Sequence, residues 1–186
     1  MKNILIIFDC FGVIFNEVAP VFLRRHLPKE TADTVKEKLF VPADLGLVTH
    51  EELLRNMADE VGLPLEEVKA EWESLFVIKK DTVDYIMRLK QHYDIALLSN
   101  APTGVVEGLF EKHNLGRLFD NTLISCNVGL AKPDPAIYRR CVSLFNKEYD
   151  EIYMIDDSPK NLEVLPSIGI KPVLFRTVDD LECLLK

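Results

Sequence analysis

The chain has 186 residues, of which 48% are hydrophobic and 28% charged, and its formal net charge at pH 7 is −8. This balance is typical of one globular core with room for a small second domain, and it excludes a disordered chain. The negative charge argues against nucleic acid or an anionic membrane surface as the main partner, so we expect neither.

The first predicted element is a buried strand that ends on an acid. Residues 4–9 are apolar up to Asp9, and the turn-forming Gly12 follows three residues later.

An apolar run after Lys2 could begin a secretory signal, but Asp9 interrupts the run and no small-residue cleavage site follows. The cysteines are widely spaced and form no CxxC pair, which fits a reducing compartment. We therefore expect a cytoplasmic protein without a disulfide framework.

The next stretch carries helix signals only. "THEELLRNMADEVG" contains a capping box of Thr49 and Glu52. "PLEEVKAEWESLF" places Val68, Trp72 and Phe76 four residues apart, on one face of a helix. We interpret these three side chains as the interior of a small helical domain rather than as a platform for substrate.

After this stretch, short apolar strands alternate with amphipathic helices. Later strands are expected at residues 95–99, 122–125, 152–156 and 172–175, and helices at 103–113, 135–145, 159–168 and 178–185. The alternation predicts an α/β fold, a doubly wound parallel Rossmann-like sheet between two helical layers. We expect residues 1–15 and 80–186 to form this core and residues 16–79 to form a helical cap inserted into it.

Polar side chains stand where four of the predicted strands end. In chain order they are Asp9, then Ser99 with Asn100, then Lys132, then Asp156 with Asp157. Open α/β sheets bind ligands outside the carboxyl ends of their strands. Converging carboxylates without histidine or thiolate favour Mg²⁺ over zinc, and an ammonium with hydroxyl and amide donors suits a phosphoryl group.

The chain resembles the haloacid dehalogenase-like (HAD) hydrolase superfamily over nearly its whole length. It matches the four motifs of that superfamily in order, with "FDCFGV", "LLSN", "GLAKPDPAIY" and "IDDSPKN". The helical insertion is similar to the cap of the branch that includes sugar-phosphate phosphatases and the dehalogenases themselves. The resemblance implies a Mg²⁺-dependent phosphatase of a small phosphorylated metabolite, with a sugar phosphate as one candidate. We expect a monomer or a weak dimer.

The resemblance also implies a role for individual residues. Asp9 would be the nucleophile that carries an aspartyl phosphate, with Ser99 and Lys132 as the other catalytic groups. The implied metal ligands are Asp9, the backbone carbonyl of Phe11, Asp156 and Asp157. The implied phosphate-binding and substrate-binding residues are Gly12, Ser99, Asn100 and Lys132. Asn161 is expected to brace the loop after the fourth strand.

The chain departs from the family pattern at Phe11. The family's phosphatases usually carry a second aspartate there, which protonates the departing alkoxide and activates water. General acid–base help of this kind is worth about 10²–10⁴ in rate. Asn16 and Glu17 are the nearest polar side chains in the sequence, so one of them, or a water molecule, is a candidate replacement.

The departure leaves three hypotheses open. The chain is a phosphatase whose substrate has a better leaving group, such as a sugar 1-phosphate, or which borrows an acid from the cap or from water. Alternatively it is a 2-haloacid dehalogenase, because halide departs without a proton, or a weakly active or non-catalytic phosphate-binding protein. The retained pair Asp156 and Asp157 favours the phosphatase, because dehalogenases need no cation and adjacent acids would repel a haloacid.

Overall fold

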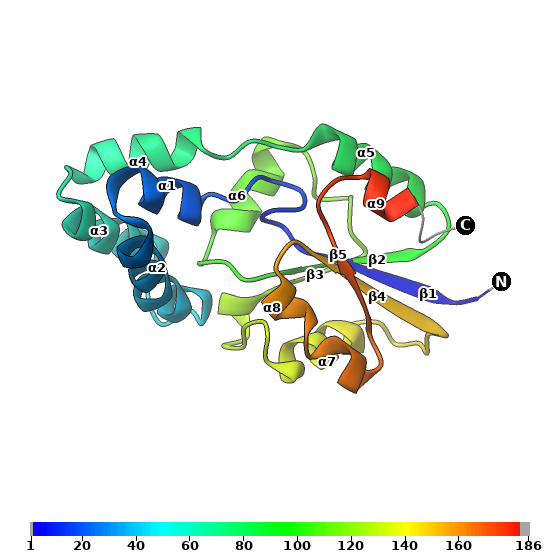
Figure 1. Cartoon of the computed structure of the whole chain (residues 1–186). Coiled ribbons are helices and arrows are strands. Elements are labelled where there is room, and N and C mark those ends of the chain that lie inside the picture. The colour runs from blue at the N-terminus through cyan, green and yellow to red at the C-terminus, as the bar shows by residue number, and fades with distance from the viewer. Residues whose placement is uncertain (1, 183–186) are drawn as a thin grey trace.

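The computed structural model describes residues 2–182, and within them the strands form one five-stranded parallel sheet (Figure 1). The strands are β1 (Ile4–Phe8), β2 (Asp94–Ser99), β3 (Asn121–Ile124), β4 (Glu151–Asp156) and β5 (Lys171–Leu174). Their order across the sheet is β3-β2-β1-β4-β5, and every neighbouring pair is parallel. The predicted doubly wound α/β fold is confirmed.

Helices cover both faces of the sheet. One face packs against α5 (Lys80–Leu89), α6 (Val105–Lys112) and α9 (Asp179–Glu182), and the other against α7 (Pro135–Ser143), α8 (Pro159–Leu162) and the 3₁₀ segment η2 (Leu165–Ile168). Successive side chains of β1 serve the two faces in turn, because a strand alternates with period two. Ile6 and Phe8 belong to the first core, and Leu5 and Ile7 to the second. Burial on both faces explains the continuous apolar strands.

A separate group of helices is inserted between β1 and α5. It consists of α1 (Ala19–His26), α2 (Lys29–Asp44), α3 (His50–Val61) and α4 (Leu65–Ser74), and Figure 1 shows it at one end of the sheet, away from both chain termini. The group has its own apolar core, which includes Phe22, Val68 and Trp72. The predicted capping box begins α3: Thr49 N donates to Glu52 Oε2 at 2.8 Å, and Glu52 N donates to Thr49 Oγ1 at 3.2 Å.

The chain crosses between this helical group and the sheet at two adjacent points. Phe15 and Ile78 form an antiparallel bridge across the two crossings. Asn16 N donates to Val77 O at 3.0 Å, and Val77 N donates to Asn16 Oδ1 at 2.7 Å. The side chain of Asn16 therefore ties the two crossing segments together.

The ends of some elements differ from their predicted positions. The helix expected over residues 159–168 is divided into α8 and η2, because Pro166 lacks the N–H that a continuous α-helix needs there. Only the first part of the helix expected at 178–185 is described, as α9, and residues 183–186, including Cys183, lie outside the described residues. Among the described helices, none is both long and apolar enough to cross a membrane.

Candidate active site

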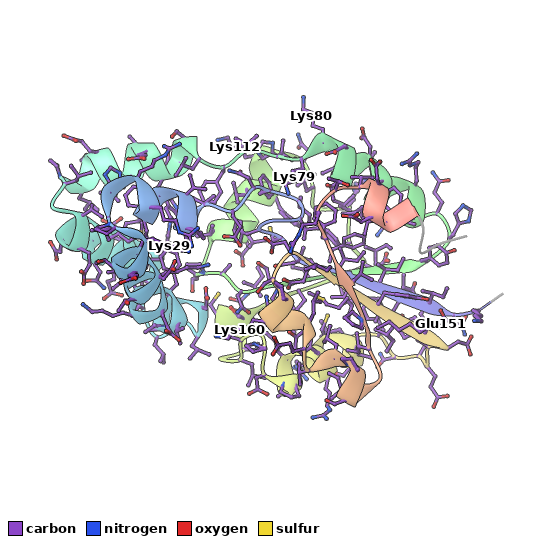
Figure 2. The ribbon with its side chains drawn as sticks, in the orientation of Figure 1. Lys29, Lys79, Lys80, Lys112, Glu151 and Lys160 are labelled. Carbon is purple, nitrogen blue, oxygen red and sulfur yellow. The ribbon has the colours of Figure 1, made fainter. Side chains whose placement is uncertain are left out.

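The polar strand ends meet beside β1, where the strand order of the sheet reverses. The chain places β2 and β3 on one side of β1 and then β4 and β5 on the other, which is the position where open α/β sheets bind ligands. In Figure 2, Lys160 at the start of α8 lies on the side of the helical group, and Glu151 at the start of β4 lies at the far end of the sheet. The carboxyl ends of the strands therefore face the α1–α4 helices.

Three carboxylates converge at this edge. Asp9 directly follows β1, Asp156 ends β4 and Asp157 comes next, and ligand oxygens of all three lie within 4.8 Å of one another. Asp9 and Asp156 are buried, and Asp157 is partly buried. Such a cluster of like charges is unstable unless cations or protons neutralise it.

One buried ammonium lies among these carboxylates. Lys132 Nζ is 2.8 Å from Asp9 Oδ1 and 2.7 Å from Asp156 Oδ2. Burial alone lowers the pKa of Lys132, but the two carboxylates outweigh it and hold the pKa above its ordinary value. Burial, with Asp156 adding to it and Lys132 opposing it, raises the pKa of Asp9 well above the ordinary range. One ammonium therefore does not neutralise the cluster.

Asn100 positions the segment that carries Lys132. Its side-chain nitrogen donates to Lys132 O at 3.0 Å, and its side-chain oxygen accepts from Lys132 N at 2.8 Å. Both ends of the Asn100 amide are thus bonded to one residue. The end of β2 in this way holds the neighbouring loop in place.

Asp156 is hydrogen-bonded on all sides, whereas Asp157 is not. The side-chain nitrogen of Asn161 donates to both oxygens of Asp156, at 3.1 and 3.0 Å, and Ser158 N donates to Oδ1 at 2.8 Å. The expected brace by Asn161 is confirmed. No hydrogen bond or ion pair reaches the Asp157 carboxylate from any described residue, and burial, Glu17 and Asp156 raise its pKa to about 6.

The cluster fits a divalent cation. Its donors are all oxygens, its negative charge exceeds the positive charge of Lys132, and the carboxylate of Asp157 is free to accept a further partner. Gly12 leaves the room that this carboxylate needs, because a Cβ on Gly12 would lie 2.2 Å from Asp157 Cγ. A hard cation such as Mg²⁺ prefers oxygen ligands of this kind.

A cavity of about 410 Å³ lies between the sheet edge and the helical group. The edge contributes residues that include Asp9, Asn100, Lys132 and Asp157, and the inserted segment contributes Glu17, Lys36, Phe40, Asp44 and others. Four aromatic rings contact one another in a row and form one wall. The distances between ring centroids are 6.0 Å from Phe11 to Phe76, 5.7 Å from Phe76 to Trp72, and 5.8 Å from Trp72 to Phe40. The cavity therefore joins charged groups to an apolar wall.

Some sequence-predicted residues lie elsewhere. Ser99 is fully buried, is still paired with Ile124 in the sheet and is not among the cavity-lining residues, and its Oγ donates to Asn100 O at 3.4 Å. Asn16 is likewise absent from the lining and is engaged at the crossing. Trp72 belongs to the core of the helical group, as expected, and also borders the cavity.

Sequence reasoning missed Asp44. This residue ends α2 and lines the cavity, two residues before Gly46. Gly46 has a φ of +73°, and a Cβ there would lie 2.6 Å from Cys126 O, so the end of α2 approaches the core closely. A glycine directly after a helix is a sequence signal for such an approach, and it points to the acid beside it.

A model of the haloacid dehalogenase-like hydrolase family matches residues 5–169. D-ribitol-5-phosphate phosphatase from Bacteroides thetaiotaomicron is 26% identical over 189 residues, covering 92% of this chain and 90% of that protein. A shorter match, 36% identical over 61 residues, is to bifunctional epoxide hydrolase 2 from Sus scrofa. It covers 33% of this chain and 11% of that protein, so the chain spans only a small part of the second relative.

The fold also matches solved structures. A HAD family enzyme from Bacteroides thetaiotaomicron, crystallised as a variant with magnesium and inorganic phosphate, superposes with a TM-score of 0.77. The match covers 100% of both chains at 23% sequence identity. At this identity the likeness establishes the shared fold.

Proposed function

The chain belongs to the haloacid dehalogenase-like hydrolase family, and we propose that it hydrolyses a small phosphate monoester with the help of Mg²⁺. The observation that carries the proposal is the meeting of three carboxylates with the buried ammonium of Lys132: Asp9 and Asp157 line one cavity, and Asp156 is buried beside them. The magnesium and phosphate bound by the Bacteroides enzyme of the same fold support it.

The proposed metal ligands are the carboxylates of Asp9, Asp156 and Asp157 and the backbone carbonyl of Phe11. When bound, Mg²⁺ supplies positive charge that offsets the repulsion between a carboxylate and phosphoryl oxygens. Lys132 adds a second positive charge from the side of Asp9 and Asp156. The raised pKa of Asp9 supports a need for such a cation, because a nearby positive charge favours the ionised carboxylate.

Asp9 is the proposed nucleophile. One oxygen of its carboxylate attacks phosphorus, and the bond from phosphorus to the ester oxygen breaks with its electron pair on that oxygen. The ester oxygen takes up a proton and leaves as the alcohol. Water then attacks the phosphorus of the aspartyl phosphate, which releases phosphate and restores the Asp9 carboxylate. Two easier displacements thereby replace one difficult attack by water.

Contacts to the phosphoryl group are proposed for Gly12, Asn100 and Lys132, and for Ser99. Asn100 and Lys132 line the cavity, which supports their share in binding. The complete burial of Ser99 favours an indirect role, in which its hydroxyl fixes the chain at Asn100. We further propose that residues 16–79 act as the cap of a core formed by residues 1–15 and 80–186.

A sugar phosphate is the substrate class that the name of the ribitol phosphate phosphatase supports. The polar groups of the inserted segment, such as Lys36 and Glu37, would meet hydroxyl groups, and the aromatic wall would meet the carbon skeleton. The cytoplasmic location, the monomeric or weakly dimeric state and the lack of a nucleic acid partner stay predictions.

A 2-haloacid dehalogenase is the second candidate, and Phe11 favours it because halide leaves without a proton. The free carboxylate of Asp157 beside Asp9 argues against it, since a haloacid carries its own negative charge. Activity on 2-chloropropionate in the presence of EDTA would support dehalogenation. Metal binding without turnover on any ester would support a binding protein.

The proposal is tested by a screen of sugar phosphates and acyl phosphates with and without Mg²⁺, repeated with Asp9→Asn. We expect turnover that needs Mg²⁺ and is abolished in the variant. Turnover that survives EDTA or the Asp9→Asn change would contradict the proposal.

A further inference from the structure

Asp44 lines the cavity, and its carboxyl group has no partner among the described residues. Asp44 is partly buried at the end of α2, and no described residue forms a hydrogen bond or an ion pair with its side chain. Carboxylates removed from water are normally hydrogen-bonded or paired within the protein. A carboxyl left unpaired inside a ligand cavity is therefore placed to act on the ligand.

Charged groups from several elements surround this carboxyl. Lys36 comes from the same helix, Glu17 from the segment after the first crossing and Lys132 from the core, and each acts electrostatically on Asp44. Asp44 in turn acts on the thiol of Cys126 in the 3₁₀ segment η1 (Ser125–Asn127). Lys132 is the ammonium that also contacts Asp9 at 2.8 Å, so one side chain acts on both the proposed nucleophile and Asp44.

The site lacks a general acid at Phe11, the position where the family's phosphatases usually carry an aspartate. The ring of Phe11 packs against Phe76 in the aromatic wall and carries no proton to donate. Of the two other residues suggested by the sequence, Asn16 is bonded to Val77 and lies outside the cavity lining. Glu17 lines the cavity but raises the pKa of Asp157, so it stands close to the proposed metal ligands.

We propose that Asp44, supplied by the inserted helices, is the general acid and base of this site in place of the group missing at Phe11. The inference rests on the proposed phosphatase function and adds a catalytic residue to it. The close approach of Gly46 to Cys126 O holds the end of α2 that carries Asp44 against the core.

The proton balance closes over one turnover. In the first step, Asp9 attacks phosphorus, the ester oxygen leaves with the electron pair of its bond to phosphorus, and the carboxylic acid of Asp44 gives that oxygen its proton. In the second step, the Asp44 carboxylate takes a proton from the water that attacks the aspartyl phosphate. Phosphate leaves, and both carboxyl groups return to their starting states.

The environment of Asp44 suits both roles. Burial raises its pKa to about 7, against the opposing effect of Lys36 and Lys132. A group that titrates near the operating pH is protonated often enough to donate and ionised often enough to accept. A solvent-exposed aspartate would be ionised at neutral pH and could serve only as a base.

The test compares two probes in the full-length protein with saturating Mg²⁺. 4-Nitrophenyl phosphate releases a phenolate that leaves without a proton, whereas 2-phenylethyl phosphate releases an alkoxide that needs one. The ratio kcat/KM reports the first step, in which the alcohol departs. We expect Asp44→Asn and Asp44→Ala to lower kcat/KM by about 10²–10⁴ on the phenylethyl ester and by less than tenfold on the nitrophenyl ester.

Two further readouts separate proton transfer from a structural effect. In Asp44→Asn the second step loses its base, so 4-nitrophenyl phosphate should give a burst of about one nitrophenol per enzyme followed by slow turnover. In the wild type, kcat/KM on the phenylethyl ester should fall above about pH 7. In the variant, this fall of kcat/KM with rising pH should be absent. Glu30→Gln, an exposed acid on the same helix and outside the cavity, should match the wild type throughout.

Failures of the two proposals are distinguishable. If the wild type hydrolyses neither ester with Mg²⁺, the phosphatase function falls and this inference falls with it. If the wild type hydrolyses both, and Asp44→Asn is unchanged or loses activity equally on both, only the role of Asp44 is overturned. The same holds if Glu17→Gln, and not Asp44→Asn, produces the loss that depends on the leaving group.

Discussion

Gly12 and Asp157 approach so closely that no side chain fits between them: a Cβ on Gly12 would lie 2.2 Å from Asp157 Cγ. Gly12 also has a φ of +83°, in the left-handed region that only glycine adopts freely. The turn after β1 and the end of β4 are therefore fitted to each other at the carboxylate cluster.

Gly12→Ala should impair the metal site more than it impairs the fold. The left-handed backbone costs a non-glycine residue roughly 1–2 kcal/mol, and the clash in addition displaces the Asp157 carboxylate. We expect at least a tenfold rise in the Mg²⁺ concentration needed for half-maximal activity, about 1.4 kcal/mol, measured by titrating activity with Mg²⁺.

Gly62→Ala is the matched control for that substitution. Gly62 has a φ of +70° at the end of α3, and a Cβ there meets nothing within 4 Å. It should lose similar thermal stability without any change in Mg²⁺ dependence. An unchanged Mg²⁺ requirement in Gly12→Ala would show that Asp157 has no part in the metal site.

Replacing Lys132 should destabilise the fold strongly. Lys132→Met leaves Asp9 and Asp156 buried without their ammonium, and breaking a buried pair in this way costs about 3–5 kcal/mol. Urea unfolding measures the loss.

Lys147→Met is the control for charge removal at the surface. Lys147 pairs with Asp94, but its side chain is 53% exposed, so the change should cost no more than about 1 kcal/mol. Equal losses in the Lys132 and Lys147 variants would mean that the buried cluster does not depend on its ammonium.

Mg²⁺ should stabilise the wild type through the carboxylate cluster. Binding to the folded state alone adds about 2.7 kcal/mol when the ion is present at a hundred times its Kd. Asp157→Asn should lose most of this gain in thermal unfolding and most of its binding heat in titration calorimetry. Asp59→Asn, an exposed acid on α3, should keep both. Full Mg²⁺ binding by the Asp157 variant would remove that residue from the proposed ligands.

Asp44→Asn should become more stable than the wild type as the pH rises. In the wild type, burial holds the pKa of Asp44 at about 7, while the unfolded chain titrates near its ordinary value of about 3.9. Between these values folding takes up a proton, so wild-type stability falls with rising pH. The gain of the variant should grow from about pH 4 to pH 7 and then level off, at up to about 4 kcal/mol.

Asp33→Asn, on the same helix, is the control, because the pKa of Asp33 is shifted in the opposite direction to that of Asp44. Its hydrogen bond to Arg24 lowers the pKa of Asp33, so the amide should give no gain at neutral pH. Urea unfolding of both variants between pH 4 and 8 measures the difference. A constant gain of Asp44→Asn across this range would mean that Asp44 titrates normally in the folded protein.

Most of the site could be predicted from the polar residues that follow the strands in the sequence. Asp9, Lys132, Asp156 and Asp157 could be placed together in advance because parallel strands bring their carboxyl ends to one edge. The continuous apolar strands likewise predicted burial on both faces. Local chemistry fixed the capping box of α3, since a cap satisfies neighbouring backbone groups and needs no distant partner.

Only the tertiary structure decided what faces the cluster from the other side. Ser99 stands at a strand end yet is sealed in the sheet, and Asp44, distant in the sequence and without a motif, borders the cavity. The spacing of apolar residues in a strand or helix predicts which residues share a face. It does not predict which face of the inserted helices meets the core. That choice depends on packing between segments, such as the close approach of Gly46 to the backbone of Cys126, which holds the end of α2 against the core.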